Sequence, residues 1–285
     1  MISHPALAGA LLRSLVAVLW VLALAGPVPA QETSEDDRVE ARAMLNRGVE
    51  AYKHAKFDDA VTDFERAKEL DPSLVNAQIY LAVAYASQYV PGATSPENLH
   101  YGELATQEFR AILDKDPTNI SAIDGIGSIL YNMGGTPFDV EKLEKAKEYQ
   151  ELHIRLRPDD PEPYYWVGVI DWSIAYRSNQ DIRNEYNRNA RQAIKPADPL
   201  TPDLAARFNV GFGRGIDEGI SNLKKTIDLK PNHTDAMAYL NLLYRQKADT
   251  EISASARAND LRMADDLVDQ VMKIKRREAA APQFR

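Results

Sequence analysis

Residues whose types could do chemistry are few in this chain, and their spacing is poor for it. Cysteine is absent, which excludes a thiolate metal site, a cysteine nucleophile and a disulfide framework. The chain has five histidines, His4, His54, His100, His153 and His233, and their spacing does not fit a metal site. The four after His4 are interpreted as surface or helix-end residues.

Glycines and paired carboxylates are the remaining chemical candidates. The run from Gly211 to Gly215, GFGRG, is similar to a phosphate-binding loop, but it lacks the preceding strand and the G-x-G-x-x-G spacing. A flexible joint or a close helix contact is the favoured interpretation. The acidic pairs at 58–59, 159–160 and 265–266 are typical of helix starts and solvated faces. With no Walker lysine, G-x-S-x-G or H-E-x-x-H motif, we predict no catalytic residue, cofactor or metal.

The first thirty residues have the pattern of a signal peptide. They carry one basic residue, Arg13, and an apolar run over 14–25, followed by Gly26-Pro27 and small residues up to Ala30. The run is shorter than the roughly 20 residues of a membrane span. We therefore predict a cleaved signal peptide over 1–30 and a periplasmic protein, with an uncleaved anchor as the alternative. No cysteine follows the run, which argues against a lipoprotein.

Charge narrows the class of partner. The whole chain has a net charge of −8, and without residues 1–30 it is −9. An acidic protein is a poor partner for nucleic acid and for anionic membrane surfaces. The basic run at 273–277 is interpreted as favourable charge at a helix C-terminus.

A signature with a period near 34 residues predicts the fold. Its clearest copy is 41–74, with small residues, a phenylalanine and a terminal proline at Gly48, Ala51, Ala60, Phe64, Ala67 and Pro72. This pattern resembles the tetratricopeptide repeat (TPR), a pair of antiparallel helices. The resemblance implies an all-α solenoid of about five repeats, similar to exported bacterial TPR proteins. Scaffolds of this kind usually bind rather than catalyse.

Prolines that end helices define the repeat boundaries. An acidic leader is expected over 31–40 and a flexible tail over 278–285, with repeats at 41–74, 75–119, 120–160, 161–233 and 234–277. Turn-rich insertions lengthen the second and third repeats within their hairpins. Small residues are expected wherever the paired helices approach closely; these are Gly48, Ala60, Ala82, Ala105, Gly127, Ala146, Gly168 and Gly219.

The fourth repeat is unusually long. Apolar residues recur at helical spacing from Val167 to Ile194 and again from Leu204 to Ile227. We expect two long antiparallel helices whose outer part, 178–213, forms a projecting hairpin. A degenerate extra repeat is the alternative.

The resemblance also implies a binding surface. In TPR proteins, positions 2, 5, 9, 12 and 13 of each repeat line a concave groove. The groove residues predicted here are Arg42, Leu45, Val49, Tyr52, Lys53, Ile79, Val83, Tyr131, Asn132, Tyr165, Trp172, Leu242 and Arg245. The same positions also hold Asn76, Ala86, Ser87, Ser121, Asp124, Ser128, Glu162, Val169, Ser173, Asp235, Ala238 and Gln246.

The residue types at these positions indicate which kinds of peptide binding to expect. Adaptors that clamp the C-terminal carboxylate of cytosolic chaperones have Lys and Asn where this chain has Leu45 and Val49. Tyr165 and Trp172 are types enriched at interface hot spots, although they could equally fill packing between long helices.

The sequence therefore predicts a non-catalytic interaction scaffold of the bacterial cell envelope. It would bind a peptide or helix of an envelope protein in the groove, and the hairpin would add a second contact. The alternative is an enzyme, or an accessory subunit of one, with a site in the inter-helix insertions.

Overall fold

A computed structural model describes residues 33–280, and every regular element in that range is helical. The predicted signal peptide and the last residues of the predicted tail lie outside the described residues. The helices are α2 (Glu35–Lys53), α3 (Phe57–Leu70), α4 (Val75–Gln88), α5 (Pro96–Leu113), α6 (Ile120–Gly135), α7 (Val140–Leu156), α8 (Pro161–Asn187), α9 (Pro202–Phe208), the π-helical turn η1 (Asn209–Gly213), α10 (Arg214–Leu229), α11 (Thr234–Thr250) and α12 (Ala254–Ala280).

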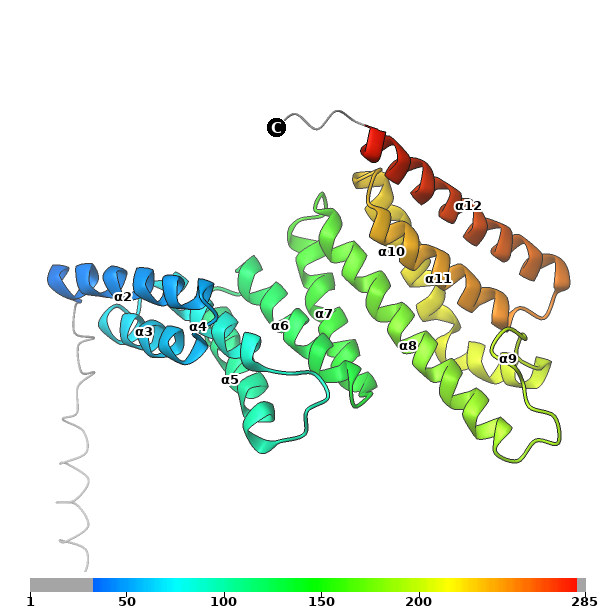
Figure 1. Ribbon diagram of the computed structural model, residues 1–285, viewed down its shortest axis with the longest axis horizontal. Coiled ribbons are helices and arrows are strands. Elements are labelled where there is room, and N and C mark those ends of the chain that lie inside the picture. Colours follow the sequence, from blue (N-terminus) through cyan, green and yellow to red (C-terminus); the bar gives the residue numbers. More distant parts are fainter. Residues whose placement is uncertain (1–32, 281–285) are drawn as a thin grey trace, which may run out of the picture.

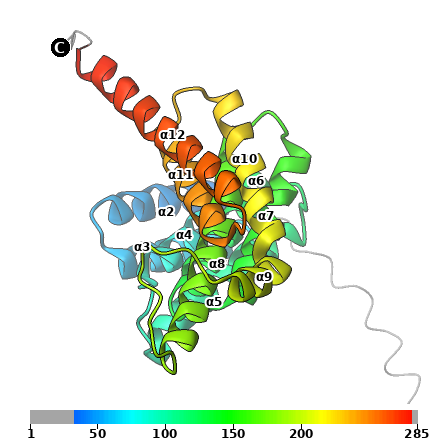
Figure 2. The same ribbon diagram turned by 90° about the vertical axis from the view of Figure 1, so that its right-hand side faces the viewer.

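These helices form a stack of antiparallel pairs in chain order (Figure 1). The pairs are α2–α3, α4–α5, α6–α7, α8 with α9–α10, and α11–α12, and each packs against the next. The predicted all-α solenoid of about five repeats, with an extended hairpin in the fourth, is confirmed. The last turns of α12 extend past the rest of the stack (Figure 2).

Short polar side chains explain where several helices begin. Ser34, Ser95, Asn119, Asp139 and Asp160 each accept a hydrogen bond from a backbone N–H of the first turn. Such caps satisfy donors that the helix itself leaves unpaired. Because Ser34 caps it, α2 begins within the segment expected to be an acidic leader.

Small residues lie at the helix contacts, as predicted. Ala60, Ala82, Ala105 and Ala146 are fully buried. A Cβ added to Gly168 would lie 2.3 Å from Leu223 Cγ, and one added to Gly48 would lie 2.6 Å from Phe64 Cε1. No side chain fits in these spaces without separating the helices.

The first long helix of the fourth pair, α8, ends earlier than predicted from the run of apolar residues that continues to Ile194. Helix α8 ends at Asn187, so Ile194 lies in the connecting segment. The Asn187 side chain explains the difference, because it binds the backbone of Ile194 through both of its polar atoms, at 2.8 and 3.1 Å. This local pairing replaces further helical turns.

Helix α9, the η1 turn and α10 follow one another without a break. The glycine-rich segment forms the π-helical turn, which inserts one extra residue into the helix. Gly211–Gly215 is therefore helical and is neither a phosphate loop nor a flexible joint.

The fourth pair is the predicted hairpin of two long helices, but its outer part does not project freely. Phe208 is completely buried in a core cluster with α11. The backbone N–H of Leu200 donates to Asp249 O at 2.9 Å, and the buried Arg183 donates to the Asp249 carboxylate at 3.0 Å. The expected hairpin therefore forms, but its outer part packs against the end of α11 instead of projecting freely.

A buried ionic cluster links the third and fourth pairs. Lys147 of α7 donates to Asp171 of α8 at 2.7 Å and to Glu218 of α10 at 2.8 Å. The side chains of Lys147 and Asp171 are 9% and 2% exposed, whereas that of Glu218 is 37% exposed. Burial raises the pKa of Asp171 to about 7, against the opposing effect of Lys147. With this pKa the Asp171 carboxyl ionises around neutral pH, and the charged amine of Lys147 favours its ionised form.

Removing the charge of Lys147 should destabilise the fold. We expect Lys147→Met to lower the free energy of unfolding by about 3–5 kcal/mol, because it leaves the buried Asp171 uncompensated. Urea denaturation measures the change. Lys145→Met is the matched control, since Lys145 is exposed and pairs with the exposed Glu148 of its own helix.

A double variant separates charge from packing. Lys147→Met with Asp171→Leu should recover most of the lost stability, because both buried charges are then removed. Equal stabilities for the Lys147 and Lys145 variants would contradict the role given to the cluster.

Candidate protein-binding surface

The first helices of the five pairs are α2, α4, α6, α8 and α11, and their outward side is here called the first-helix face. The predicted groove residues all lie on these helices. None of the thirteen main candidates is buried: Arg42, Lys53, Asn132, Leu242 and Arg245 are exposed, and the other eight are partly buried. They are therefore accessible in the described part of the chain.

The other positions taken from the repeat pattern divide into two groups. Val169 and Gln246 are only 1% and 6% exposed, so their assignment to the groove was wrong. They lie on α8 and α11, two helices that pack against each other. Asp124, Ser128 and Glu162 have accessible side chains.

At the N-terminal end the predicted residues form an apolar strip. Leu45, Val49 and Tyr52 of α2 pack on the core cluster beneath the first two pairs. The Tyr52 hydroxyl lies 2.8 Å from Ser87 Oγ of α4, which joins the two first helices. Ile79 and Val83 pack partly buried on the next cluster.

At the C-terminal end the structure brings three predicted residues into one aromatic surface. It comprises Tyr131 of α6; Tyr165, Trp166, Trp172 and Tyr176 of α8; and Tyr239 of α11. Successive ring centroids lie 5.3–5.8 Å apart. These distances are within the range of favourable aromatic contacts.

These aromatic rings pack against the core on one side and are partly accessible on the other. Tyr165, Trp172 and Tyr239 pack on the C-terminal core cluster while remaining partly accessible. Tyr176, stacked on Trp172, is 41% exposed. The packing interpretation and the binding interpretation of Tyr165 and Trp172 are thus compatible.

Burial also fixes the ionisation of this surface. Burial, with smaller effects of the nearby Tyr239 and Asp235, raises the pKa of Tyr165 to about 12. The pKa of Tyr239 is raised by the same cause. Both hydroxyls therefore stay protonated near neutral pH and can donate hydrogen bonds.

Sequence reasoning missed Trp166, Tyr176 and Tyr239. A signal for two of them was present, because position 6 of the second, fourth and fifth repeats is aromatic: Tyr80, Trp166 and Tyr239. Tyr176 lies beyond the usual length of a first helix and has no equivalent in the other repeats.

Several predicted residues lie apart from the aromatic surface. Arg245 donates to Asp265 of α12 at 2.6 Å, so it joins the last two helices. Lys53 pairs with Glu50 of its own helix. Arg42 and Asn132 are exposed on α2 and α6.

The histidines are less uniform than predicted. His54 and His100 lie in exposed pairs with Glu50 and Glu103, in agreement with a surface role. His153 is in the last turn of α7 and His233 caps α11, so both are at helix ends, but they are only 3% and 9% exposed.

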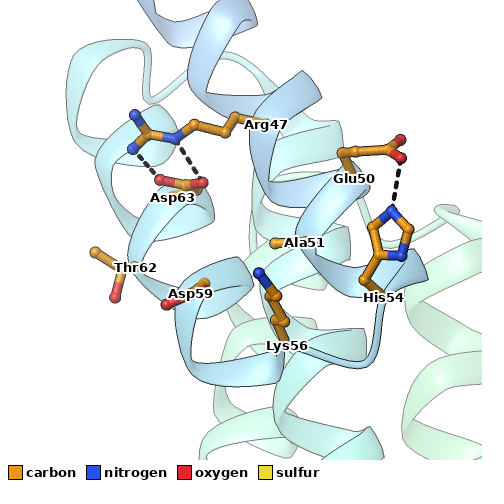
Figure 3. A pocket seen from close by; sticks show the side chains of 8 residues that line it. All are labelled: Arg47, Glu50, Ala51, His54, Lys56, Asp59, Thr62 and Asp63. Atoms are coloured by element: carbon orange, nitrogen blue, oxygen red, sulfur yellow. Dashed lines mark hydrogen bonds and ion pairs between the residues drawn. The ribbon is translucent and has the colours of Figure 1, made fainter.

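A separate hollow of about 470 Å³ lies between α2 and α3 (Figure 3). Arg47 binds both carboxylate oxygens of Asp63, and His54 lies 3.1 Å from Glu50. Arg47, Glu50 and His54 have side chains more than 60% exposed. These charges are already paired and hydrated, so the hollow is a weaker candidate than the aromatic surface.

Within residues 33–280, no three His, Asp or Glu side chains come together as a metal-binding group. In the same range, none of the helices combines the length and hydropathy that a membrane span requires.

Comparison with known proteins gives one sequence relative of note and several structural ones. No protein-family model matches the chain. The type IV pilus assembly protein PilF of Pseudomonas aeruginosa is 24% identical over 183 residues, which cover 52% of this chain and 68% of PilF.

Among solved structures, the TPR protein MamA of Desulfovibrio magneticus RS-1 has a TM-score of 0.53 at 14% identity, over 86% of this chain and 97% of MamA. A MamA RS-1 double mutant has a TM-score of 0.55 at 14% identity, over 87% and 99% of the two chains. The helix pairs, the small residues at their contacts and these likenesses identify the chain as a protein of the tetratricopeptide-repeat fold, as its resemblance to that family predicts.

Proposed function

We propose that this protein is a non-catalytic scaffold that binds a peptide or helix of a cell-envelope protein on its first-helix face. The observation that carries the proposal is the aromatic surface over α6, α8 and α11, whose members touch one another and remain partly accessible. Tyrosine and tryptophan are enriched among residues that dominate binding energy. Partly immobilised rings also lose little conformational entropy when a partner binds.

The fold supports binding by a repeat surface rather than by a single cleft. Helices α2 and α4, α4 and α6, and α8 and α11 pack against each other. Tyr131 of α6 contacts Trp166 of α8, which links the remaining neighbouring pair. An extended peptide or a helix could lie across several repeats in this way. The predicted N-terminal residues Leu45, Val49 and Tyr52 would then provide further apolar contacts.

An envelope location is part of the proposal. It is supported by the signal-peptide pattern of residues 1–30 and by the likeness to PilF, which is a type IV pilus assembly protein. Catalysis in the inter-helix insertions is the second candidate, but no specific feature of the described residues favours it.

The contribution of Trp172 tests the binding surface. We expect Trp172→Ala to weaken binding of the partner captured from the source organism's envelope by about tenfold, as for a hot-spot residue. Quantitative co-purification, followed by titration with that purified partner, measures the change. Leu156→Ala is the control, because Leu156 is an exposed apolar residue of the second helix α7, outside both the aromatic surface and the hairpin.

Thermal unfolding of both variants establishes that they are folded. If Trp172→Ala proves unstable, Tyr176→Ala replaces it, since Tyr176 is 41% exposed and contributes less to the core. Unchanged affinity in a folded Trp172 or Tyr176 variant would refute the proposed surface.

The export proposal has its own test. The mature protein should begin at Gln31, because Ala30 ends the small-residue segment that follows the apolar run. Intact-mass measurement of the protein from the periplasmic fraction should give the mass of residues 31–285. A protein that retains residues 1–30 and stays with the membrane would instead support the uncleaved anchor.

A further inference from the structure

A partly enclosed pocket of about 150 Å³ lies between α6, α7 and α8, beside the aromatic surface. Its lining includes Tyr131 and Trp166, the carboxylates of Asp124 and Glu162, and the buried side chain of His153. Drug-sized ligands occupy roughly 300–1,000 Å³. This volume therefore suits one side chain rather than a whole small molecule.

Two aromatic rings form an angled corner of the pocket. The rings of Tyr131 and Trp166 lie 5.5 Å apart at an interplanar angle of 63°. The Tyr131 hydroxyl is 3.3 Å from Ser173 Oγ of α8, which holds the first ring in place. Ring faces carry partial negative charge and attract a cation within about 6 Å, and tryptophan does so most strongly.

Carboxylates add negative charge at the entrance. The side chains of Asp124 and Glu162 are 44% and 50% exposed, so each reaches both pocket and solvent. Lys230 pairs with Glu162 at 3.2 Å, but both side chains are half exposed, and such pairs are weak and easily exchanged. A ligand cation could therefore compete for Glu162.

His153 is the buried polar group at this site. Its Nδ1 lies 2.7 Å from Asp124 Oδ1, while its Nε2 has no hydrogen-bond partner among residues 33–280 and lies 3.5 Å from the Asp160 carboxylate. Burial raises the pKa of Asp124 although the hydrogen bond and charge of His153 oppose the increase. The Asp124 carboxyl has one oxygen on His153 while its side chain is 44% exposed, so a further cation at the pocket could approach it and would favour its ionised form.

The helix end at the pocket does not favour an anion instead. Helix α8 begins here, and the N-terminus of a helix carries partial positive charge. Asp160 already accepts the N–H of Glu162 at 2.9 Å, and Glu162 itself adds a negative charge to the first turn. The three carboxylates of Asp124, Asp160 and Glu162 therefore outnumber the nearby cations Arg157 and Lys230.

We propose that this pocket binds a lysine or arginine side chain of the polypeptide partner, with the cation against Tyr131 and Trp166 and its charge balanced by Asp124 and Glu162. The proposal rests on the proposed function and assigns to it a partner with a basic residue. The net charge of −8 on this chain favours the approach of such a partner.

Titration with single-residue probes tests this directly. The probes are Nα-acetyl-lysine N-methylamide and its arginine counterpart, with the norleucine compound as the uncharged control. The readout is the indole N–H signal of Trp166 in the ¹⁵N-labelled protein, assigned with Trp166→Phe. Trp172, elsewhere on the aromatic surface, gives an internal reference signal.

A basic probe should shift the Trp166 signal saturably, with a dissociation constant on the order of millimolar for so small a ligand. Norleucine should bind at least about fivefold more weakly. Glu162→Gln should weaken the basic probe by about fivefold and leave norleucine unchanged. The matched control is Glu148→Gln, an exposed carboxylate of α7 outside the pocket.

Asp124→Asn should have an effect similar to Glu162→Gln, provided that its thermal unfolding is normal. If it unfolds, Glu162→Gln alone decides, because that side chain is half exposed. Equal affinities for lysine and norleucine, a shift confined to Trp172, or no saturation at Trp166 would each overturn the proposal. If one of these results is found while partner binding still depends on Trp172, the basic-residue pocket is refuted. The proposed function then remains supported.

Discussion

Close packing of α8 against α10 at Gly168 is the contact on which the proposed binding surface depends. Leu223 occupies the space that a side chain at position 168 would need. Tyr165 and Trp172 lie three residues before and four residues after this glycine, on the adjoining flank of the helix. Because the Gly168 side of α8 packs closely on α10, the neighbouring side of α8 is directed toward α11 and the outer face. The aromatic surface is thus a consequence of how the two helices meet.

The ionic cluster contributes a different property to the same region. A glycine contact sets how closely two helices approach, but apolar packing alone is tolerant of small shifts. Lys147 binds carboxylates on α8 and α10 at defined distances, so it relates the third pair to the fourth. The separation between Tyr131 on α6 and Trp166 on α8 depends on that relation, since α6 is paired with α7. Packing and buried charge therefore act together to place the rings.

Much of the fold could be predicted because it depends on local patterns. Prolines, small residues and apolar spacing defined the helix pairs, and Gly48, Gly168 and Ala60 lie at the contacts that the repeat pattern predicted. The end of α8 could not be predicted, because its apolar stripe continues to Ile194 while the Asn187 side chain binds the backbone of that residue. Nor could the fit of the hairpin against α11, which depends on pairs such as Arg183 with Asp249, distant in sequence.

The candidate site shows the same division. Repeat positions identified Tyr131, Tyr165 and Trp172, but they omitted Trp166 and Tyr239, which connect these residues into one surface. The pocket depends on His153 lying beside Asp124, on two helices whose register only the packed structure defines. A single sequence contains the residue types of such a site and not their distances.

The central claim is that the first-helix face binds the partner. Its most direct test is photo-crosslinking in the source organism from a benzoylphenylalanine placed at one position at a time. Ser128 and Leu242 are exposed positions of first helices, whereas Glu148 and Lys225 are exposed positions of second helices. Crosslinks from 128 and 242 to one common protein, with none to it from 148 and 225, are predicted. Crosslinks to that protein from the second-helix positions alone, or equally from all four, would contradict the account.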